Sequence, residues 1–402
     1  MCTQEQSPLP LTGVRVVDLS SVVMGPLATR MLADLGADVI WVESPEGDVL
    51  RHYEPMRNTK MGAFAMNVNR NKRSVVLDLK TETGQAALTD LLTTADVFVT
   101  NMRRGAITRL RIDEARVRAV SPDIIYCIAN GFGSNGPYAD RAAYDDVIQA
   151  ASGLASTFMW NGGEPRLVPT VMADKVAGIH VAFAITAALY GREQTGKGVR
   201  LEVPMAETLA AFNLVEHLSG QTFIPQVGEF SYKRIRTPHR KPRRTSDGWI
   251  VILPYSFDNW RRFFEFGGRQ DLVNDERFAT AGGRVNNADE LYAYCDDIVK
   301  TKSTDEWLVF CAEHSVPASA VVDLEKLGED PHFAAVGLLQ EDQHPTEGAY
   351  RYVRDPIKID GQIHTVRQHA PRAGENTAEV FRELGWNDER IAALFETRRK
   401  DV

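Results

Sequence analysis

The first half of the chain alternates short apolar runs with longer segments in which apolar residues recur at helical spacing. The apolar run at residues 11–21, "LTGVRVVDLSS", is followed at 25–37 by "GPLATRMLADLGA", where leucine and methionine recur every three to four positions. A second apolar run, "DVIWVES", follows at 38–44. Strand, helix and strand within about 30 residues is typical of a parallel βαβ unit with a right-handed crossover.

The same alternation continues along the chain. It predicts strands at 73–80 and 96–101, a helix at 82–95, an apolar segment at 121–132, and a long helix from about Asp174 to Gly191. We therefore expect an α/β fold with a doubly wound, Rossmann-like layer over about the first 200 residues.

The pattern changes after this layer, and 402 residues are too many for one ordinary core. We predict a large α/β domain whose N-terminal part is 10–200, a linker at 201–234 and a small α+β domain at 235–325. Residues 326–402 are expected to form a linker and C-terminal helices that return to the large domain.

Composition narrows the class of protein. Hydrophobic residues make up 44% and charged residues 25%, as in soluble globular proteins, and the net charge of -8 argues against a nucleic-acid partner. The four cysteines, Cys2, Cys127, Cys295 and Cys311, are scattered without a CxxC pair, which indicates reduced thiols and no zinc site. No export signal and no run of about 18 apolar residues is found, so we expect a cytoplasmic protein without a membrane partner.

Several local features allow both a structural and a functional interpretation. The turn "SSVVMGPL" has a single glycine where a dinucleotide fingerprint requires three, which argues against NAD. The basic segments at 69–74 and 101–111 are either solvated or bind a phosphorylated ligand. The basic run at 233–244 is either an exposed linker or a surface near the mouth of the active site that attracts an acidic substrate.

Asp174 is the one carboxylate in the approach to the long apolar helix. It could be the N-cap of this helix, accepting a backbone N–H. It could also be a nucleophile, because an ionised carboxylate near the positive end of the helix dipole can attack a thioester carbonyl. The residues alone leave both interpretations open.

Taken in order, the segments resemble the class III CoA-transferase family almost from end to end. The resemblance is carried by "LTGVRVVDLSSVVMGPLATRMLADLGADVIWVESPEGDVLR", "NRNKRSVVLDLK", "DVFVTNMRRGAITRL", "NGFGSNGPYADRAAYDDVIQAASGLAS", "VMADKVAGIHVAFAITAALYGREQTGKG", "SVPASAVVDLEKLGEDPHF" and "APRAGENTAEVFRELGW". Each segment taken alone is weak evidence for the family, but the segments in this order are highly specific for it.

The resemblance implies a CoA-transferase in which Asp174 is the nucleophile. The carboxylate would attack an acyl-CoA to give a mixed anhydride and CoA thiolate, and the returning CoA would form an aspartyl-CoA thioester. A carboxylic acid acceptor would then take the CoA by the reverse chemistry. CoA is a substrate here, and neither a metal nor a permanently bound cofactor is implied.

The resemblance also implies a set of CoA-binding positions. These are Val22, Val23 and Met24 for the pantetheine and thioester, Asn101 and Met102 at a strand end, Arg109 for the nucleotide, and Arg73 and Tyr144. The chain departs from formyl-CoA transferase in having Val23 where that enzyme has a glutamine, and in lacking its glycine-rich loop. Both departures argue against formate and oxalate as its acids.

The family further implies a homodimer with interlocked chains. An alternative of the same fold is an acyl-CoA racemase or epimerase, which moves an α-proton with a histidine at the position of Tyr144. A phenol, whose usual pKa is about 10, is a poor base at neutral pH, which favours the transferase. A non-catalytic CoA-binding protein is a second alternative, and the identities of the acids stay open.

Overall fold

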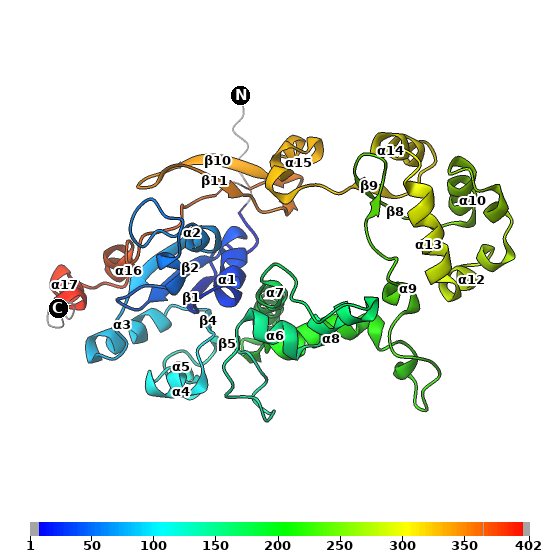
Figure 1. Cartoon of the computed structure of the whole chain (residues 1–402). Coiled ribbons are helices and arrows are strands. Elements are labelled where there is room, and N and C mark those ends of the chain that lie inside the picture. The colour runs from blue at the N-terminus through cyan, green and yellow to red at the C-terminus, as the bar shows by residue number, and fades with distance from the viewer. Residues whose placement is uncertain (1–7, 365, 397–402) are drawn as a thin grey trace. The chain divides into compact units, whose positions relative to one another are not determined.

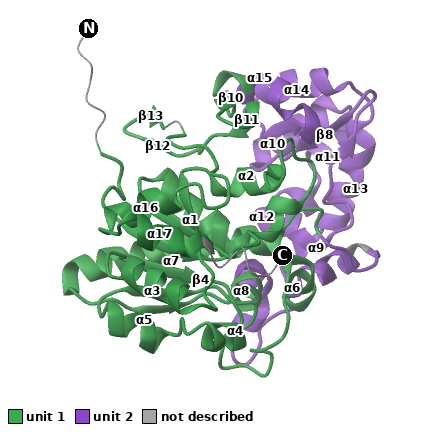
Figure 2. Ribbon diagram, turned by 90° about the vertical axis from the view of Figure 1, so that its left-hand side faces the viewer, with its two compact units in different colours: residues 1–152, 168–210, 334–402 green, residues 153–167, 211–333 purple. Residues whose placement is uncertain are grey.

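The computed structural model describes residues 8–364 and 366–396 of the chain. The chain forms two compact units, which Figure 2 shows in different colours. Unit 1 comprises residues 1–152, 168–210 and 334–402, and unit 2 comprises residues 153–167 and 211–333. Each unit is therefore assembled from segments that are far apart in the sequence.

A six-stranded parallel sheet forms the centre of unit 1, in the order β3-β2-β1-β4-β5-β6. Its strands are β1 (Arg15–Leu19), β2 (Asp38–Glu43), β3 (Lys72–Val76), β4 (Val97–Thr100), β5 (Ile125–Ile128) and β6 (Arg200–Glu202). The prediction of an α/β fold around a parallel sheet is confirmed. The strand order reverses between β1 and β4, and ligands of open α/β sheets bind at the carboxyl ends of the strands at such a reversal.

Helices cover both faces of this sheet (Figure 1). On one face lie α1 (Met24–Asp34), α2 (Ala63–Asn69) and α7 (Met172–Thr195), and on the other α3 (Glu82–Leu92), α5 (Glu114–Val120), α16 (Thr377–Glu383) and α17 (Asp388–Glu396). Two further helices of unit 1 are α4 (Arg104–Arg109) and α6 (Asp145–Ala151). The second face buries one apolar cluster, in which Val17 and Phe98 of the sheet meet Phe381 of α16.

A buried ion pair ties α1 and α2 to the sheet. Lys72 Nζ lies 3.1 Å from a carboxylate oxygen of Asp18, and neither side chain is exposed. The same ammonium donates to the carbonyl of Pro26 in α1 and to the side chain of Asn69 in α2, both at 2.9 Å. Burial lowers the pKa of Lys72, although Asp18 opposes this effect. A buried charge is tolerated only when it is paired and hydrogen-bonded, as it is here.

The C-terminal segment returns to the sheet in unit 1. Asn376 exchanges hydrogen bonds with Ser74 of β3, and the hydroxyl of Thr377 accepts the N–H of Val76 at 3.2 Å. These contacts cover the edge strand β3, which would otherwise expose unpaired backbone groups.

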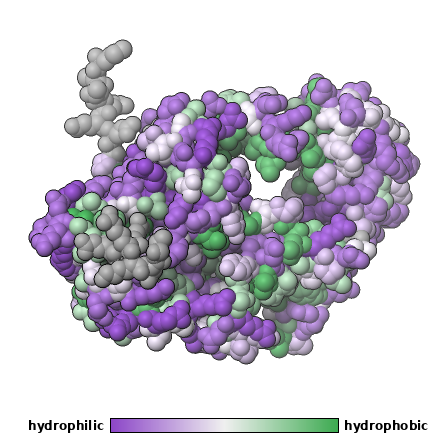
Figure 3. Space-filling model, turned by 60° about the vertical axis from the view of Figure 1, so that its left-hand side comes forward, coloured by the Kyte–Doolittle hydropathy of each residue, from purple (hydrophilic) through white to green (hydrophobic). Residues whose placement is uncertain are grey.

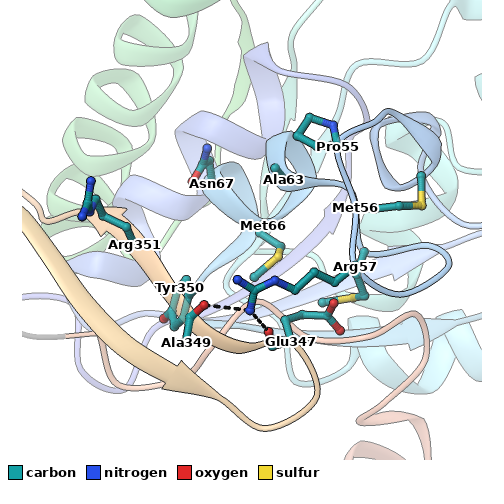
Figure 4. Close-up of a pocket in the computed structure, with 11 residues that line it drawn as sticks. Pro55, Met56, Arg57, Ala63, Met66, Asn67, Glu347, Ala349, Tyr350 and Arg351 are labelled. Carbon is teal, nitrogen blue, oxygen red and sulfur yellow. Dashed lines mark hydrogen bonds between the residues drawn. The ribbon is translucent and has the colours of Figure 1, made fainter. Parts of the chain in front are cut away.

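Two antiparallel hairpins precede this return, formed by β10 (Leu339–His344) with β11 (Gly348–Val353) and by β12 (Lys358–Ile359) with β13 (Gln362–Ile363). Figure 4 shows Arg57 pointing toward the turn between β10 and β11, where its guanidinium donates to the carbonyls of Glu347 and Ala349. A pocket of about 340 Å³, lined partly by Met56 and Met66, lies beside this contact.

Unit 2 is built around a small antiparallel sheet and helices. The sheet has the order β7-β8-β9, with β7 (Arg243–Arg244), β8 (Trp249–Ile252) and β9 (Ala318–Ala320). The helices are α9 (Lys233–Arg236), α10 (Phe257–Phe266), α11 (Gln270–Val273), α12 (Ala281–Asn286), α13 (Ala288–Val299) and α14 (Thr304–Glu313). Helix α8 (Met205–His217) leads from unit 1 into unit 2, and α15 (Pro331–Ala335) leads back.

Helix α7 is long and apolar enough to cross a membrane by length and composition, although the sequence pattern predicted no such segment. A core helix of a soluble protein passes the same test. One side of α7, including Ala177 and Val181, is buried, and the helix packs on α1 and β5. Its apolar character is therefore explained in part by this packing.

Glycine is required where α7 crosses α1. A Cβ added at Gly178 would lie 2.9 Å from the carbonyl oxygen of Met24, which is backbone and cannot rotate away. At Gly191, farther along the same helix, an added Cβ would meet nothing within 4 Å. Close packing therefore requires glycine at Gly178, whereas Gly191 has room for a side chain.

We expect Gly178→Ala to destabilise the protein by about 1–3 kcal/mol, because the helices must separate to admit the methyl group. Gly191→Ala is the matched control and should stabilise by about 0.5–1 kcal/mol, because alanine favours a helix interior. Denaturant unfolding of both variants measures the difference. Equal effects of the two substitutions would contradict the close packing described here.

Candidate active site

The carboxyl ends of β1 and β4 are joined by one amide side chain. Asn101, which follows β4, accepts the N–H of Ser21 at 3.0 Å and donates to the carbonyl of Ser21 at 2.7 Å. Both backbone polar groups of Ser21 are thus bound by a single side chain. This arrangement fixes the loop that leads from β1 into α1.

The loop itself has an unusual backbone. Val22 has a φ of 68°, in the left-handed region that β-branched residues rarely adopt. Its N–H donates to the carboxylate of Asp48 at 3.0 Å. A Cβ at Gly25 would lie 2.2 Å from the Cβ of Ser20, so this turn accepts only glycine. The constrained loop directs Val23 and Met24, at the start of α1, toward the side of the sheet where α7 begins.

Asp174 lies in the first turn of α7, but it is not the N-cap. The N-cap is Val171, and it makes no side-chain capping hydrogen bond. The capping interpretation of Asp174 is therefore wrong, because the residue lies three positions inside the helix. Its own N–H instead donates to the side chain of Asp145 at 3.0 Å. The carboxylate of Asp174 is left to face the Met24 backbone N–H at the start of α1.

A buried pair on α6 holds the start of α7. Asp145 accepts the side-chain amide of Gln149 at 2.6 Å, and both residues are buried. The amide of Gln149 also donates to the carbonyl of Thr170 at 3.1 Å, and its oxygen accepts the N–H of Val168 at 2.8 Å. Asp145 and Gln149 therefore position the segment that carries Asp174.

The environment of Asp174 raises the pKa of its carboxyl to about 7. Burial is the main cause and the nearby Asp145 carboxylate is the second, while the hydrogen bond from the Met24 N–H opposes both. The sequence had suggested a carboxylate kept ionised by the helix dipole. In the structure the surroundings instead raise the pKa of this carboxyl, because burial and the Asp145 carboxylate disfavour its ionised form.

A pocket of about 170 Å³ opens at this point. Seven of the residues predicted from the resemblance line it together: Val22, Val23, Met24, Asn101, Met102, Tyr144 and Asp174. The lining also includes residues that were not predicted as site residues, namely Arg103, Arg104, Ala129, Asn130, Gly131, Arg141 and Met205, with Ser21, Ala139 and Ala143. Arg103 and Arg104 belong to a basic segment that the sequence analysis had noted, whereas no local pattern pointed to the backbone after β5.

Two predicted binding residues do not line this pocket. Arg73 lies near the amino end of β3 and is buried, with its guanidinium 2.7 Å from Asp38 and 2.6 Å from Glu383. These carboxylates raise its pKa against the effect of burial. Arg73 therefore forms ion pairs within the protein, and its role in the structure is to hold β3 to these carboxylates. Arg109 is exposed at the end of α4.

A second pocket adjoins the first through a shared residue. It measures about 140 Å³ and is lined by the segments after β2 and β3, including Ser44 and Lys80. Met102 lines both pockets, and Leu110, next to Arg109, lines the second one. The two pockets therefore form neighbouring sites along the carboxyl edge of the sheet.

Part of the basic run at 233–244 forms ion pairs within unit 2. Asp296 of α13 lies within 3.3 Å of His239, Lys241 and Arg243. Arg243 is buried, so this part of the run is a structural attachment to α13. The interpretation of the run as a solvated linker is therefore wrong for Arg243, whereas the side chain of Lys241 is exposed.

No group of three or more His, Cys, Asp or Glu that could hold a metal ion occurs among the described residues. Cys127, Cys295 and Cys311 are free and buried, and Cys2 lies outside the described residues. Burial raises the pKa of the Cys295 thiol to about 12, which leaves it unreactive.

Comparison with known proteins identifies relatives of the whole chain. A model of CoA-transferase family III matches residues 11–377. The chain is 33% identical over 386 residues to the succinate–glutarate CoA-transferase of Agrobacterium fabrum, covering 93% of this chain and 96% of the relative. It is 30% identical over 416 residues to a formyl-CoA:oxalate CoA-transferase of Rhodopseudomonas palustris, covering 97% of each.

The fold is also found among solved structures. A CAIB/BAIF family protein from Brucella suis is 30% identical and aligns with a TM-score of 0.79, covering 94% of this chain and all of that one. A protein from Mycobacterium tuberculosis aligns with the same TM-score at 30% identity, covering 92% of this chain and 99% of the other.

The raised pKa of Asp174 predicts a pH-dependent gain in stability for Asp174→Asn. An ordinary carboxyl of the unfolded chain titrates at about 4, whereas Asp174 in the folded chain titrates at about 7. Ionisation therefore favours the unfolded state, and the wild type loses stability as the pH rises from about 4 to about 7. The asparagine variant avoids this loss, so its advantage should grow over this range and level off above it.

Thermal melting from pH 4 to pH 9 measures this difference, and we expect the variant's Tm to exceed that of the wild type by at least about 2 °C at pH 8. The control is Asp146→Asn, which replaces an exposed carboxylate of the adjacent helix α6. A Tm difference for Asp174→Asn that does not vary with pH would refute the shifted pKa.

Proposed function

The chain belongs to CoA-transferase family III, and we propose that it transfers CoA between an acyl-CoA and a carboxylic acid with Asp174 as the covalent nucleophile. The observation that carries this proposal is the position of the Asp174 carboxylate. It faces the Met24 backbone N–H inside a pocket at the carboxyl edge of the sheet, and its pKa is about 7. Such a carboxylate is available in its ionised form at neutral pH and is only weakly solvated, which favours nucleophilic attack.

In the first half of the proposed reaction, a carboxylate oxygen of Asp174 bonds to the acyl carbon of the thioester. The C–S bond breaks and CoA leaves as a thiolate, which leaves a mixed anhydride on the enzyme. The thiolate then attacks the aspartyl carbonyl, the donor acid departs as a carboxylate, and Asp174 carries CoA as a thioester. In the second half the acceptor carboxylate attacks this thioester, and the same steps run in reverse.

Backbone N–H groups are the proposed donors to the oxyanion of each tetrahedral intermediate. Val23, at the position where formyl-CoA transferase has a glutamine, offers no side-chain donor. The backbone at Val23 and Met24 forms the start of α1 and lines the pocket. The first N–H groups of a helix lack intrahelical acceptors, so they can stabilise a developing negative charge.

The proposed path of CoA follows the two neighbouring pockets. Its thioester end would lie beside Asp174, and the chain would pass Met102, which lines both pockets, toward Ser44 and Lys80. Arg103, Arg104 and Arg141 line the first pocket and would attract the phosphates. Arg109 precedes Leu110 of the second pocket and is retained as a proposed contact to the nucleotide, whereas Arg73 is not.

The relatives guide the choice of acids. One relative with 33% identity is named as a succinate–glutarate enzyme. We therefore propose dicarboxylates as the first donors and acceptors to test, with succinyl-CoA and glutarate as the initial pair. Tyr144 lines the pocket beside Asp174 in place of a histidine base, which favours transfer over racemisation.

The covalent mechanism predicts that Asp174→Asn lowers turnover by at least about 10³-fold, because an amide cannot form the anhydride. Wild-type protein incubated with succinyl-CoA and then with hydroxylamine should carry a hydroxamate on Asp174, detectable by peptide mass spectrometry. Asp146→Asn again serves as the control and should keep its activity. Normal turnover by Asp174→Asn, or a label at another residue, would contradict the proposed nucleophile.

We also propose that the protein is a homodimer, as the family resemblance implied. Unit 1 exposes Ile179, Phe183 and Tyr190 along α7, with exposed fractions of 52%, 72% and 71%. Unit 2 exposes Val215 and Ile224, at 82% and 98%. Figure 3 shows apolar patches within a largely hydrophilic surface on the face that it draws. Ile179, Phe183 and Tyr190 recur at helical spacing along α7, and an exposed apolar strip on a helix is typical of a surface that a partner covers.

Light scattering at micromolar concentration should give about twice the chain mass of 44.7 kDa. Phe183→Glu should shift the population toward the monomer, because a carboxylate would be buried at the interface. Lys197→Glu, a charge reversal on an exposed residue after α7, is the control. A wild-type protein that stays monomeric would exclude the dimer.

A further inference from the structure

Unit 2 contains a pocket of about 390 Å³ that the proposed reaction does not use. It lies between the segments that carry α9, α10, α12 and α13, and every residue that lines it belongs to unit 2. Its volume is within the range of small-molecule sites, which is about 300–1,000 Å³. The lining contains no aspartate or glutamate.

Two arginines line this pocket without carboxylate partners. Arg234 donates its Nε to the hydroxyl of Tyr292 at 2.7 Å, and Arg284 donates one Nη to the carbonyl of Phe278 at 2.8 Å. Among the residues that the structure describes, neither guanidinium forms an ion pair with a carboxylate. Neighbouring arginines of unit 2 do: Arg269 lies 2.6 Å from Asp271, and Arg277 lies 2.6 Å from Asp275. The pocket therefore presents two guanidinium groups that have no carboxylate at ion-pair distance among the described residues.

The rest of the wall is mainly aromatic and apolar. Trp260, Leu291 and Tyr292 are buried and line the pocket, and Tyr232 and Tyr255 contribute more exposed rings. The ring centroids of Trp260 and Tyr292 are 6.4 Å apart, with an angle of 24° between the ring planes. Flat apolar groups pack well against such walls.

We propose that this pocket binds an aryl carboxylate, with the carboxylate on Arg234 and Arg284 and the ring against the aromatic wall. Guanidinium groups present parallel N–H donors that match the two oxygens of a carboxylate. A cation is excluded by the two arginines. A neutral ring would leave the arginines uncompensated, and a bare inorganic anion would leave the apolar wall uncovered. Only a ligand with both parts satisfies the whole lining.

This inference goes beyond the proposed transferase reaction and does not depend on it. None of the residues that line this pocket lines the pocket of Asp174. The test measures binding rather than turnover, so failure of the proposed reaction and failure of this proposal are distinguishable.

The experiment is a calorimetric titration of the full chain with benzoate, benzamide and inorganic phosphate. Benzoate should bind in a saturable way, and benzamide and phosphate should each bind at least about tenfold more weakly, because each lacks one of the two recognised parts. Arg234→Gln and Arg284→Gln should each raise the Kd of benzoate about tenfold. Arg269→Gln, which removes an arginine with a carboxylate partner, should leave the Kd unchanged.

A further variant separates loss of binding from loss of folding. Val285→Trp fills the pocket without altering either arginine, and it should abolish benzoate binding while the thermal melt shows a folded protein. The proposal is overturned if benzoate does not bind, if benzamide or phosphate binds as tightly, or if folded Arg234→Gln, Arg284→Gln and Val285→Trp proteins all keep the wild-type Kd.

Discussion

The close approach of α7 to the start of α1 is the constraint on which the candidate site depends. It places a carboxylate from one helix against the backbone N–H of Met24 in the other. Gly178 allows this approach because any larger residue would collide with the Met24 carbonyl. On the other side, the Lys72 ammonium binds Asp18 of the sheet and the Pro26 carbonyl of α1, so α1 cannot move away. The geometry of the site is therefore fixed by packing and by a buried ion pair beneath it.

This arrangement has an electrostatic consequence that is unfavourable for stability and useful for chemistry. Burial and the neighbouring Asp145 both disfavour the ionised form of Asp174. Asp145 cannot be dispensed with, because its carboxylate binds the Asp174 N–H and the side chain of Gln149. The protein thus uses one carboxylate to cap a helix and thereby raises the pKa of another. Titratable groups shifted toward neutral pH are found preferentially at functional sites.

Much of this could be predicted from the sequence, because it depends on local pattern. The alternation of apolar strands with amphipathic segments predicted the parallel sheet, and the position of Asp174 at the start of an apolar helix singled it out. The capping interpretation failed because the cap comes from Asp145, 29 positions away in the chain. The left-handed backbone of Val22 could not be predicted either, since it depends on contacts to Asp48 and Asn101, which come from other loops.

The arginines show most clearly that contacts between distant residues cannot be predicted from local sequence pattern. In the sequence, Arg73 and Arg109 look alike, since each belongs to a basic segment next to a predicted strand. In the structure Arg73 is buried among carboxylates, whereas Arg109 is exposed at the end of α4. A paired arginine has already exchanged its hydration for a carboxylate of the protein, so it has little left to offer a ligand. A run of basic residues in a sequence therefore indicates a binding surface only where those residues do not form ion pairs with carboxylates of the folded protein.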